Sequence, residues 1–140
     1  MKFMLMIMAP RGTGDYVVKE SGDYDVWDWK PEDGKAHQGH MSRLTADLKK
    51  AGQLVAVDGL APPAQGRRVR ADTAGSPIIS DGPFAEAKEF LVGYWIVDVE
   101  TPEEAYAIAA RASAAPGPGG KPLNLSIEVR QVMAGPRTES

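Results

Sequence analysis

Two residues combine acid–base chemistry with a place at the end of a structural element. His40 opens a stretch of helical periodicity, and its imidazole changes charge near neutral pH, so it suits a general acid or base. Asp81 stands in the string SDGPF, directly before an apolar run that has the character of a central strand. A carboxylate held at the mouth of that strand can orient a histidine or polarise a ligand group. We therefore take His40 and Asp81 as the candidate catalytic residues.

Both residues also have a purely structural interpretation. An aspartate in a turn accepts hydrogen bonds from nearby backbone amides, and Gly82 and Pro83 suit the backbone angles of a tight turn. His40 can equally be a surface residue at the start of a helix. If the catalytic interpretation holds, the Asp81 carboxylate should lie within about 3 Å of amides in its own turn. It should also stand at the rim of a cavity that His40 faces.

Four further residues are candidates for contact with a ligand. Arg68 and Arg70, in the string GRRVR, have the bidentate geometry that holds an anionic group. Such a run is also typical of a solvated strand edge. Phe84 and Tyr94 either fill the core or line a ligand cavity. The expected ligand-binding residues are therefore Arg68, Arg70, Phe84 and Tyr94.

The residue inventory argues against a metal or haem requirement. The chain has no cysteine and only two histidines, His37 and His40, and no carboxylate cluster stands at ligand spacing. Two histidines one helical turn apart are too few to hold a metal without a nearby carboxylate. We expect no metal and no cofactor.

Length and composition indicate one globular domain. The 140 residues suit a single domain over 1–140, and 43% hydrophobic and 25% charged residues are ordinary for a soluble protein. A net charge of −3 disfavours a nucleic-acid binder. The apolar start MKFMLMIMAP is too short for a membrane span, which needs about 20 residues. We therefore expect a cytoplasmic protein with no nucleic-acid or membrane partner.

Hydrophobic periodicity divides the first part of the chain into a strand, an excursion and a helix. Residues 2–8 are apolar on both faces, as expected of a buried strand. Residues 11–36 have no period and form a long loop excursion. Helical spacing of apolar residues begins at His40 and runs to Ala51. Four aromatic residues of the excursion are expected to pack back on the body: Tyr16, Tyr24, Trp27 and Trp29.

The rest of the chain predicts further strands and a second helix. Thr101 and Pro102 are typical of the cap and first turn of a helix. The other expected elements are a strand at 53–57, a ribbon made of GRRVRA and SPIIS, a central strand at 90–99, a loop at 115–122, an alternating strand at 125–130 and a frayed tail at 135–140. This order is β-α-β-β-α-β. Two helices on one face of an antiparallel sheet make a ferredoxin-like α+β fold.

Several strings together resemble one protein family. DLKKAG, DGLAP, GRRVR, DGPFAEAKE, GYWIVDV, EEA and IEVRQV are similar to the DGPF branch of the YCII-related family, over about residues 1–8 and 40–134. The resemblance implies a dimeric α+β barrel, in which two ferredoxin-like sheets close face to face. It also implies a poorly defined function: some members of the wider family are lactone dehalogenases, many have no assigned activity, and genes of DGPF relatives often lie beside sigma-factor genes.

The resemblance further implies a His–Asp active site. HMSRL, from His40 to Leu44, matches the family's histidine string at the first helix. The family's aspartate follows the second helix, where this chain has ARASAAPGPGG and no acid. Asp81 is our hypothesis for the missing carboxylate.

We therefore expect a homodimer that binds a small organic molecule, with proton-transfer or lyase- and dehalogenase-type chemistry at His40 and Asp81. The alternative is a non-catalytic accessory or regulatory protein associated with a sigma-factor system. The residues alone leave both open.

Overall fold

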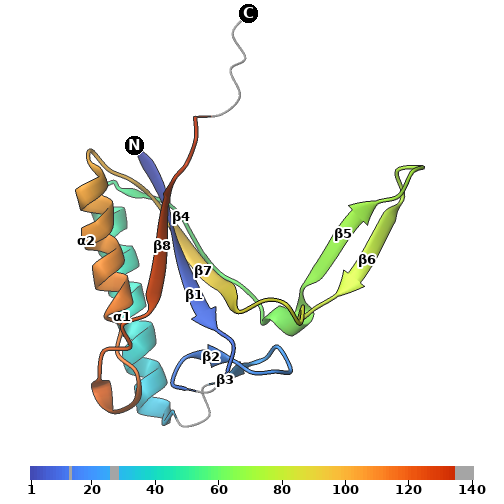
Figure 1. The fold of residues 1–140 in the computed structure, drawn as a ribbon. Helices are drawn as coiled ribbons and strands as arrows, with labels where there is room; N and C mark the ends of the chain where they lie inside the picture. The colour runs from blue at the N-terminus through green and yellow to red at the C-terminus, as the bar shows by residue number, and fades with distance from the viewer. Residues whose placement is uncertain (13, 26–28, 135–140) are drawn as a thin grey trace, which may run out of the picture.

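A four-stranded antiparallel sheet forms the centre of the protein (Figure 1). The computed structural model describes residues 1–12, 14–25 and 29–134. Its strand order is β4-β7-β1-β8, which is the order of a ferredoxin-like fold. The strands are β1 (Lys2–Pro10), β4 (Leu54–Gly59), β7 (Glu89–Asp98) and β8 (Ser126–Gln131). The predicted α+β fold is therefore confirmed. The predictions for Trp27 and for the tail at 135–140 fall outside the described residues.

The two longest strands lie next to each other in the middle of the sheet. β1 pairs with β7 from Lys2↔Asp98 to Pro10↔Glu89, and its other edge pairs with β8. Both are rich in β-branched, aromatic and long apolar residues, which suit a pleated surface buried against neighbours. This central pairing fixes which side chains of β1 and β7 share a face.

Two helices cover one face of the sheet and form the core with it. The helices are α1 (Pro31–Lys50) and α2 (Pro102–Ser113). Alternate residues of β1 point toward them, so Leu5 is fully buried, and Leu44 of α1 packs into the same core. Thr101 caps α2 as predicted, since its hydroxyl accepts a hydrogen bond from the amide of Glu104 at 3.3 Å.

The start of α1 corrects the prediction from the sequence. The helix begins at Pro31 rather than at His40, so the excursion is shorter than residues 11–36. Its first turn is fixed by Asp33, whose carboxylate accepts the amide of Lys30 at 3.0 Å and, from far along the chain, the amide of Gly119 at 3.2 Å. His37 and His40 consequently both lie inside the helix.

The excursion packs against the body, as the aromatic residues predicted. It contains the short strands β2 (Val17–Val18) and β3 (Tyr24–Asp25), which pair antiparallel. Val18 is fully buried, and Tyr16 and Tyr24 contact the core.

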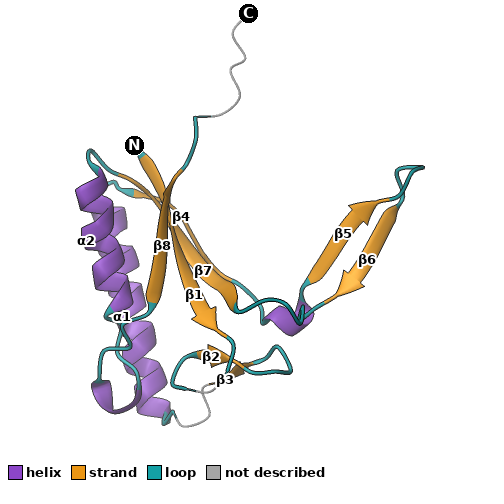
Figure 2. Cartoon of the chain, in the orientation of Figure 1, coloured by secondary structure: helices purple, strands orange, loops and turns teal. Residues whose placement is uncertain are grey.

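The predicted ribbon projects away from the body (Figures 1 and 2). β5 (Arg67–Ala71) and β6 (Pro77–Asp81) form a separate two-stranded sheet, and every residue of both strands is exposed. We call residues 67–81 the arm. Among the described residues, no helix is both long and apolar enough to cross a membrane.

The face of the main sheet that the helices do not cover is apolar at its centre and polar at its edges, where Glu128 and Arg130 of β8 and Asp58 of β4 lie. Its central side chains alternate with the buried ones along β1 and β7 and are half-buried within one chain: Met4, Met6, Met8, Tyr94 and Ile96. We call this surface the open face.

Candidate functional site

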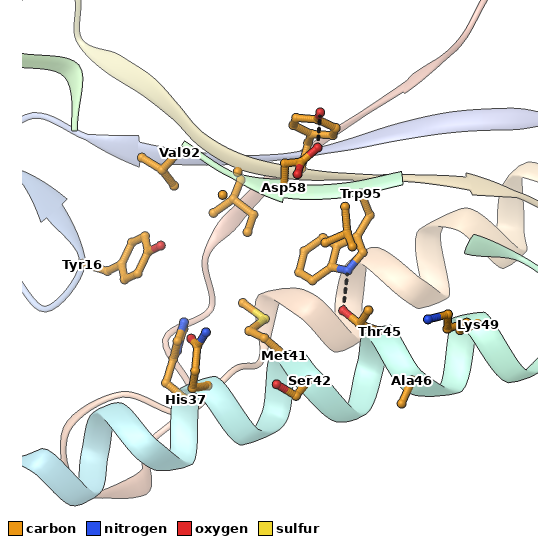
Figure 3. A pocket seen from close by; sticks show the side chains of 16 residues that line it. Tyr16, His37, Met41, Ser42, Thr45, Ala46, Lys49, Asp58, Val92 and Trp95 are labelled. Carbon is orange, nitrogen blue, oxygen red and sulfur yellow. Dashed lines mark hydrogen bonds between the residues drawn. The ribbon is translucent and has the colours of Figure 1, made fainter. Parts of the chain in front are cut away.

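A cleft of about 490 Å³ opens between α1 and the edge of the sheet formed by β4 and β7 (Figure 3). Seven residues of α1 line one wall, and four of them are spaced four apart: His37, Met41, Thr45 and Lys49. Residues four apart stand above one another on a helix, so these side chains make a single stripe. The opposite wall includes Val92 and Trp95, and Tyr16 from the excursion closes one end.

Trp95 forms the most rigid part of the cleft. The indole is almost fully buried, and its N–H donates a hydrogen bond to the Thr45 hydroxyl at 3.2 Å. This bond links the sheet to the helix across the cleft (Figure 3). Because the one polar atom of the indole has a partner, the rest of the ring offers an apolar wall.

His37 is the histidine that lines the cleft. Its Nδ1 lies 3.0 Å from the carbonyl oxygen of Pro116. A carbonyl can only accept, so Nδ1 carries the hydrogen and the neutral ring keeps its lone pair on Nε2. Burial lowers the pKa of His37 below its ordinary value of 6.5, while the Pro116 carbonyl raises it and the nearby His40 lowers it further. The neutral imidazole therefore prevails at pH 7.

Three rings cluster where the cleft meets the excursion. The Tyr16 ring lies 5.8 Å from that of His37, and the Trp29 ring lies 5.4 Å from it, edge-on. Burial, followed by the neighbouring Tyr24, raises the pKa of Tyr16 to about 12. The Tyr16 phenol consequently stays protonated and can donate a hydrogen bond. The same rings line a second, adjoining cavity of about 470 Å³.

Stability should depend on pH through His37. Its pKa is lowered in the folded state, so below pH 6.5 the unfolded chain takes up a proton more readily than the folded chain. The free energy of unfolding should therefore fall as the pH drops from 7.5 to 5.5. Urea denaturation at both pH values should show a smaller fall for His37→Gln. An equal fall in the two proteins would contradict the assignment.

Comparison with known proteins identifies the family. The sequence profile of the YCII-related domain matches residues 1–118. The chain belongs to the YCII-related family. A related protein of Rhizobium meliloti (strain 1021), described as uncharacterized protein R00369, is 33% identical over 102 residues, which are 73% of this chain and 77% of that protein.

In this YCII-related protein His40 lies outside the cleft. Its Nε2 lies 2.7 Å from the carbonyl oxygen of Arg111, so the imidazole donates to the last turn of α2. The Arg111 side chain returns to α1 and pairs with Asp47 at 2.6 Å. His40 thus helps to hold the two helices together.

Asp81 is the last residue of the arm and lies at its base, where the arm joins the body. Its carboxylate is 81% exposed and pairs with the guanidinium of Arg67 at 2.9 Å. It lines neither the cleft nor the adjoining cavity. The structure therefore does not bring Asp81 and His40 together within one YCII-related chain. The prediction that Asp81 and His40 face the same cavity is wrong, because Asp81 belongs to the arm whereas His40 faces α2.

Two of the four expected ligand-binding residues, Arg68 and Phe84, lie together, whereas Arg70 and Tyr94 lie elsewhere. The guanidinium of Arg68 stacks on the Phe84 ring, 3.5 Å from its centroid, and pairs with Glu86. This hydrogen bond lowers the pKa of Glu86. Arg70 is exposed further along the arm. Phe84 also lines a smaller cavity of about 340 Å³ at the base of the arm.

Tyr94 belongs to the open face. Its hydroxyl donates to the Asp58 carboxylate at 2.8 Å, and this bond raises the Tyr94 pKa. Asp58 is turned away from α1 in Figure 3. Tyr94 is thus on the open face, and it is also among the residues that line the cleft.

His37 and Tyr16 were not predicted as site residues. The helix was predicted to begin at His40, so His37 was left outside it and the stripe that it forms with Met41 and Thr45 was not recognised. The spacing i, i+4, i+8 from His37 was the available signal. The described residues contain no group of three or more potential metal ligands of the His, Cys, Asp and Glu types.

Proposed function

We propose that this YCII-related protein binds a small organic molecule in the cleft, with His37 as the group that exchanges a proton with it. The observation that supports this most directly is the fixed tautomer of His37 in a cleft with apolar walls. A neutral imidazole with its lone pair on Nε2 is ready to accept a proton. The cleft volume suits a molecule smaller than or comparable to a drug.

Tyr16 complements His37 in the proposed chemistry. As Nε2 removes a proton from the bound molecule, the charge left behind needs a hydrogen-bond donor. The Tyr16 phenol stays protonated because burial raises its pKa to about 12. Lys49, at the other end of the helical stripe, supplies a positive charge for an anionic group of the ligand.

The test is deuterium exchange in a bound molecule. Small carboxylic acids, lactones and ketones are screened by chemical-shift changes at Met41 and Trp95, and each hit is incubated in D2O with the protein. We expect incorporation of deuterium to fall at least 100-fold in His37→Gln, the scale of general-base catalysis. The control variant is His40→Gln, because His40 lies outside the cleft, and it should retain the deuterium incorporation. Hits that bind without any exchange would favour the alternative, a binding or regulatory protein.

We also propose that the protein is a homodimer. The open face carries three methionines, Tyr94 and Ile96, which stay only half-buried within one chain, and neighbouring uncovered apolar residues of this kind are typical of an interface. Light scattering at micromolar concentration should give twice the chain mass of 15.0 kDa. A clean monomer would contradict the proposal.

A further inference from the structure

The arm is built to contact something other than its own chain. Its ten strand residues are all exposed, with Val69 at 61% and Ile79 at 60%. An isolated two-stranded ribbon is marginally stable in water. Large apolar side chains on such a ribbon gain stability only by packing against another surface.

The register places most apolar side chains of the arm on one face, while Ile78 lies on the other face opposite Arg70. Directly opposed residues of an antiparallel pair share a face, and the faces alternate along the strands. Val69 pairs with Ile79, and Ala71 pairs with Pro77. These four residues therefore form a continuous apolar strip, which we call the arm strip. Arg67 and Asp81 close it at the base with their ion pair.

The base of the arm holds it in a defined direction. The amide of Gly82 donates to the carbonyl of Gly66 at 2.9 Å, directly below the first pair of the ribbon. The Arg11 guanidinium donates to the carbonyls of Phe84 at 2.8 Å and of Ala87 at 3.1 Å. These bonds tie the segment after β6 to the end of β1. The arm therefore projects from an anchored base.

The arm reaches out on the side of the sheet that the helices leave uncovered. In Figure 1 the helices lie to the left of the main sheet and the arm lies to its right. The arm therefore projects into the space on the side of the main sheet where the open face lies. A body that covers the open face would lie within reach of the arm.

A second copy of the chain is the occupant that fits this space. A stable interface buries about 800 Å² on each partner. Four small or medium side chains of the arm strip fall short of that area, but the open face adds the methionines of β1 and Tyr94 and Ile96 of β7. In a twofold dimer each chain presents the same two surfaces, so both arms find the same partner surface.

We propose that the arm clasps a second copy of this chain, with the arm strip packed on the partner while the two open faces meet. This inference rests on the proposed homodimer and adds the contact that the arm makes. Each chain then covers the exposed apolar residues of the other. The arm strip contributes affinity, and the open face supplies most of the buried area.

The first test compares the dimer dissociation constants of variants with that of the wild type, measured by sedimentation or by light scattering over a dilution series. The variant Val69→Glu/Ile79→Glu places two charges in the arm strip. Its matched control is Thr73→Glu, an exposed residue in the turn of the same ribbon. We expect the dissociation constant of the double variant to rise at least tenfold and that of the control to change less than twofold. Circular dichroism checks that each variant chain remains folded.

The second test uses the absence of cysteine from the natural chain. Ile79→Cys is labelled with a benzophenone maleimide, mixed with ¹⁵N-labelled wild type and irradiated. We expect crosslinks between a light and a heavy chain. The wild type could dimerise while the double variant has the same dissociation constant as the control and crosslinks form only within one chain. In that case the proposed arm contact is wrong, but the proposed dimer is right. If the wild type is a monomer, both proposals fail.

Discussion

Gly22→Ala should destabilise the protein by about 3 kcal/mol. Gly22 has φ of 85°, in the left-handed region that costs other residues about 1–2 kcal/mol. A Cβ there would also lie 2.8 Å from Cγ of Pro83 and 2.9 Å from the amide nitrogen of Ala64. The Ala64 amide also donates to the Gly22 carbonyl at 3.0 Å, so the excursion is held against this part of the chain. Urea denaturation would measure the loss.

Gly75→Ala is the matched control for this substitution. Gly75 has nearly the same φ, 84°, but a Cβ there meets nothing within 4 Å. It should therefore cost only the backbone term, about 1–2 kcal/mol. The difference between the two variants isolates the contact of Gly22 with Pro83 and Ala64. Equal losses would show that this contact has no energetic importance.

Arg11→Met should cost about 2–4 kcal/mol. The Arg11 side chain is only 15% exposed, and its guanidinium donates to the carbonyls of Phe84 and Ala87 and lies 5.2 Å from the Phe90 ring. Methionine retains the apolar stem but leaves two partly buried carbonyls without their charged donor. Denaturation experiments should show the loss, and amide exchange should quicken around residues 84–88.

Glu20→Gln is the control for Arg11→Met, since Glu20 pairs with the same guanidinium at 3.2 Å but is 82% exposed. An exposed ion pair contributes about 0–1 kcal/mol, so this variant should stay close to wild type. If Glu20→Gln proved as damaging as Arg11→Met, the carbonyl bonds would not be what anchors the DGPF string.

The local pattern of apolar residues predicted most of the fold. Its clear error, the start of α1, has a cause that lies far along the chain. Strands β1, β7 and β8 follow from apolar runs or alternation, and α2 follows from its cap at Thr101. The early turns of α1 contain Gly34 and Gly39, which weaken a helix and hide its period. The structure stabilises them partly through Asp33 and the distant amide of Gly119. No local pattern contains that contact.

The site was harder to predict because it depends on the directions in which elements and side chains point. The pattern predicted the ribbon that ends at Asp81, but periodicity says nothing about where a ribbon points. It also could not tell that the carbonyl of Pro116 would meet His37, since they lie on different elements. The two histidines are one turn apart on α1, yet one lines the cleft and the other binds α2.

The central place of β1 has a consequence for how the chain acquires its fold. β1 is synthesised before the other elements described here, but its neighbours in the sheet are β7, which ends at Asp98, and β8, which follows still later. Pairings between such distant segments slow folding, because the entropy of closing a long loop is lost before the stabilising contacts form. The string MLMIM therefore stays unpaired during most of synthesis. We expect the nascent chain to be a client of chaperones that bind short apolar segments.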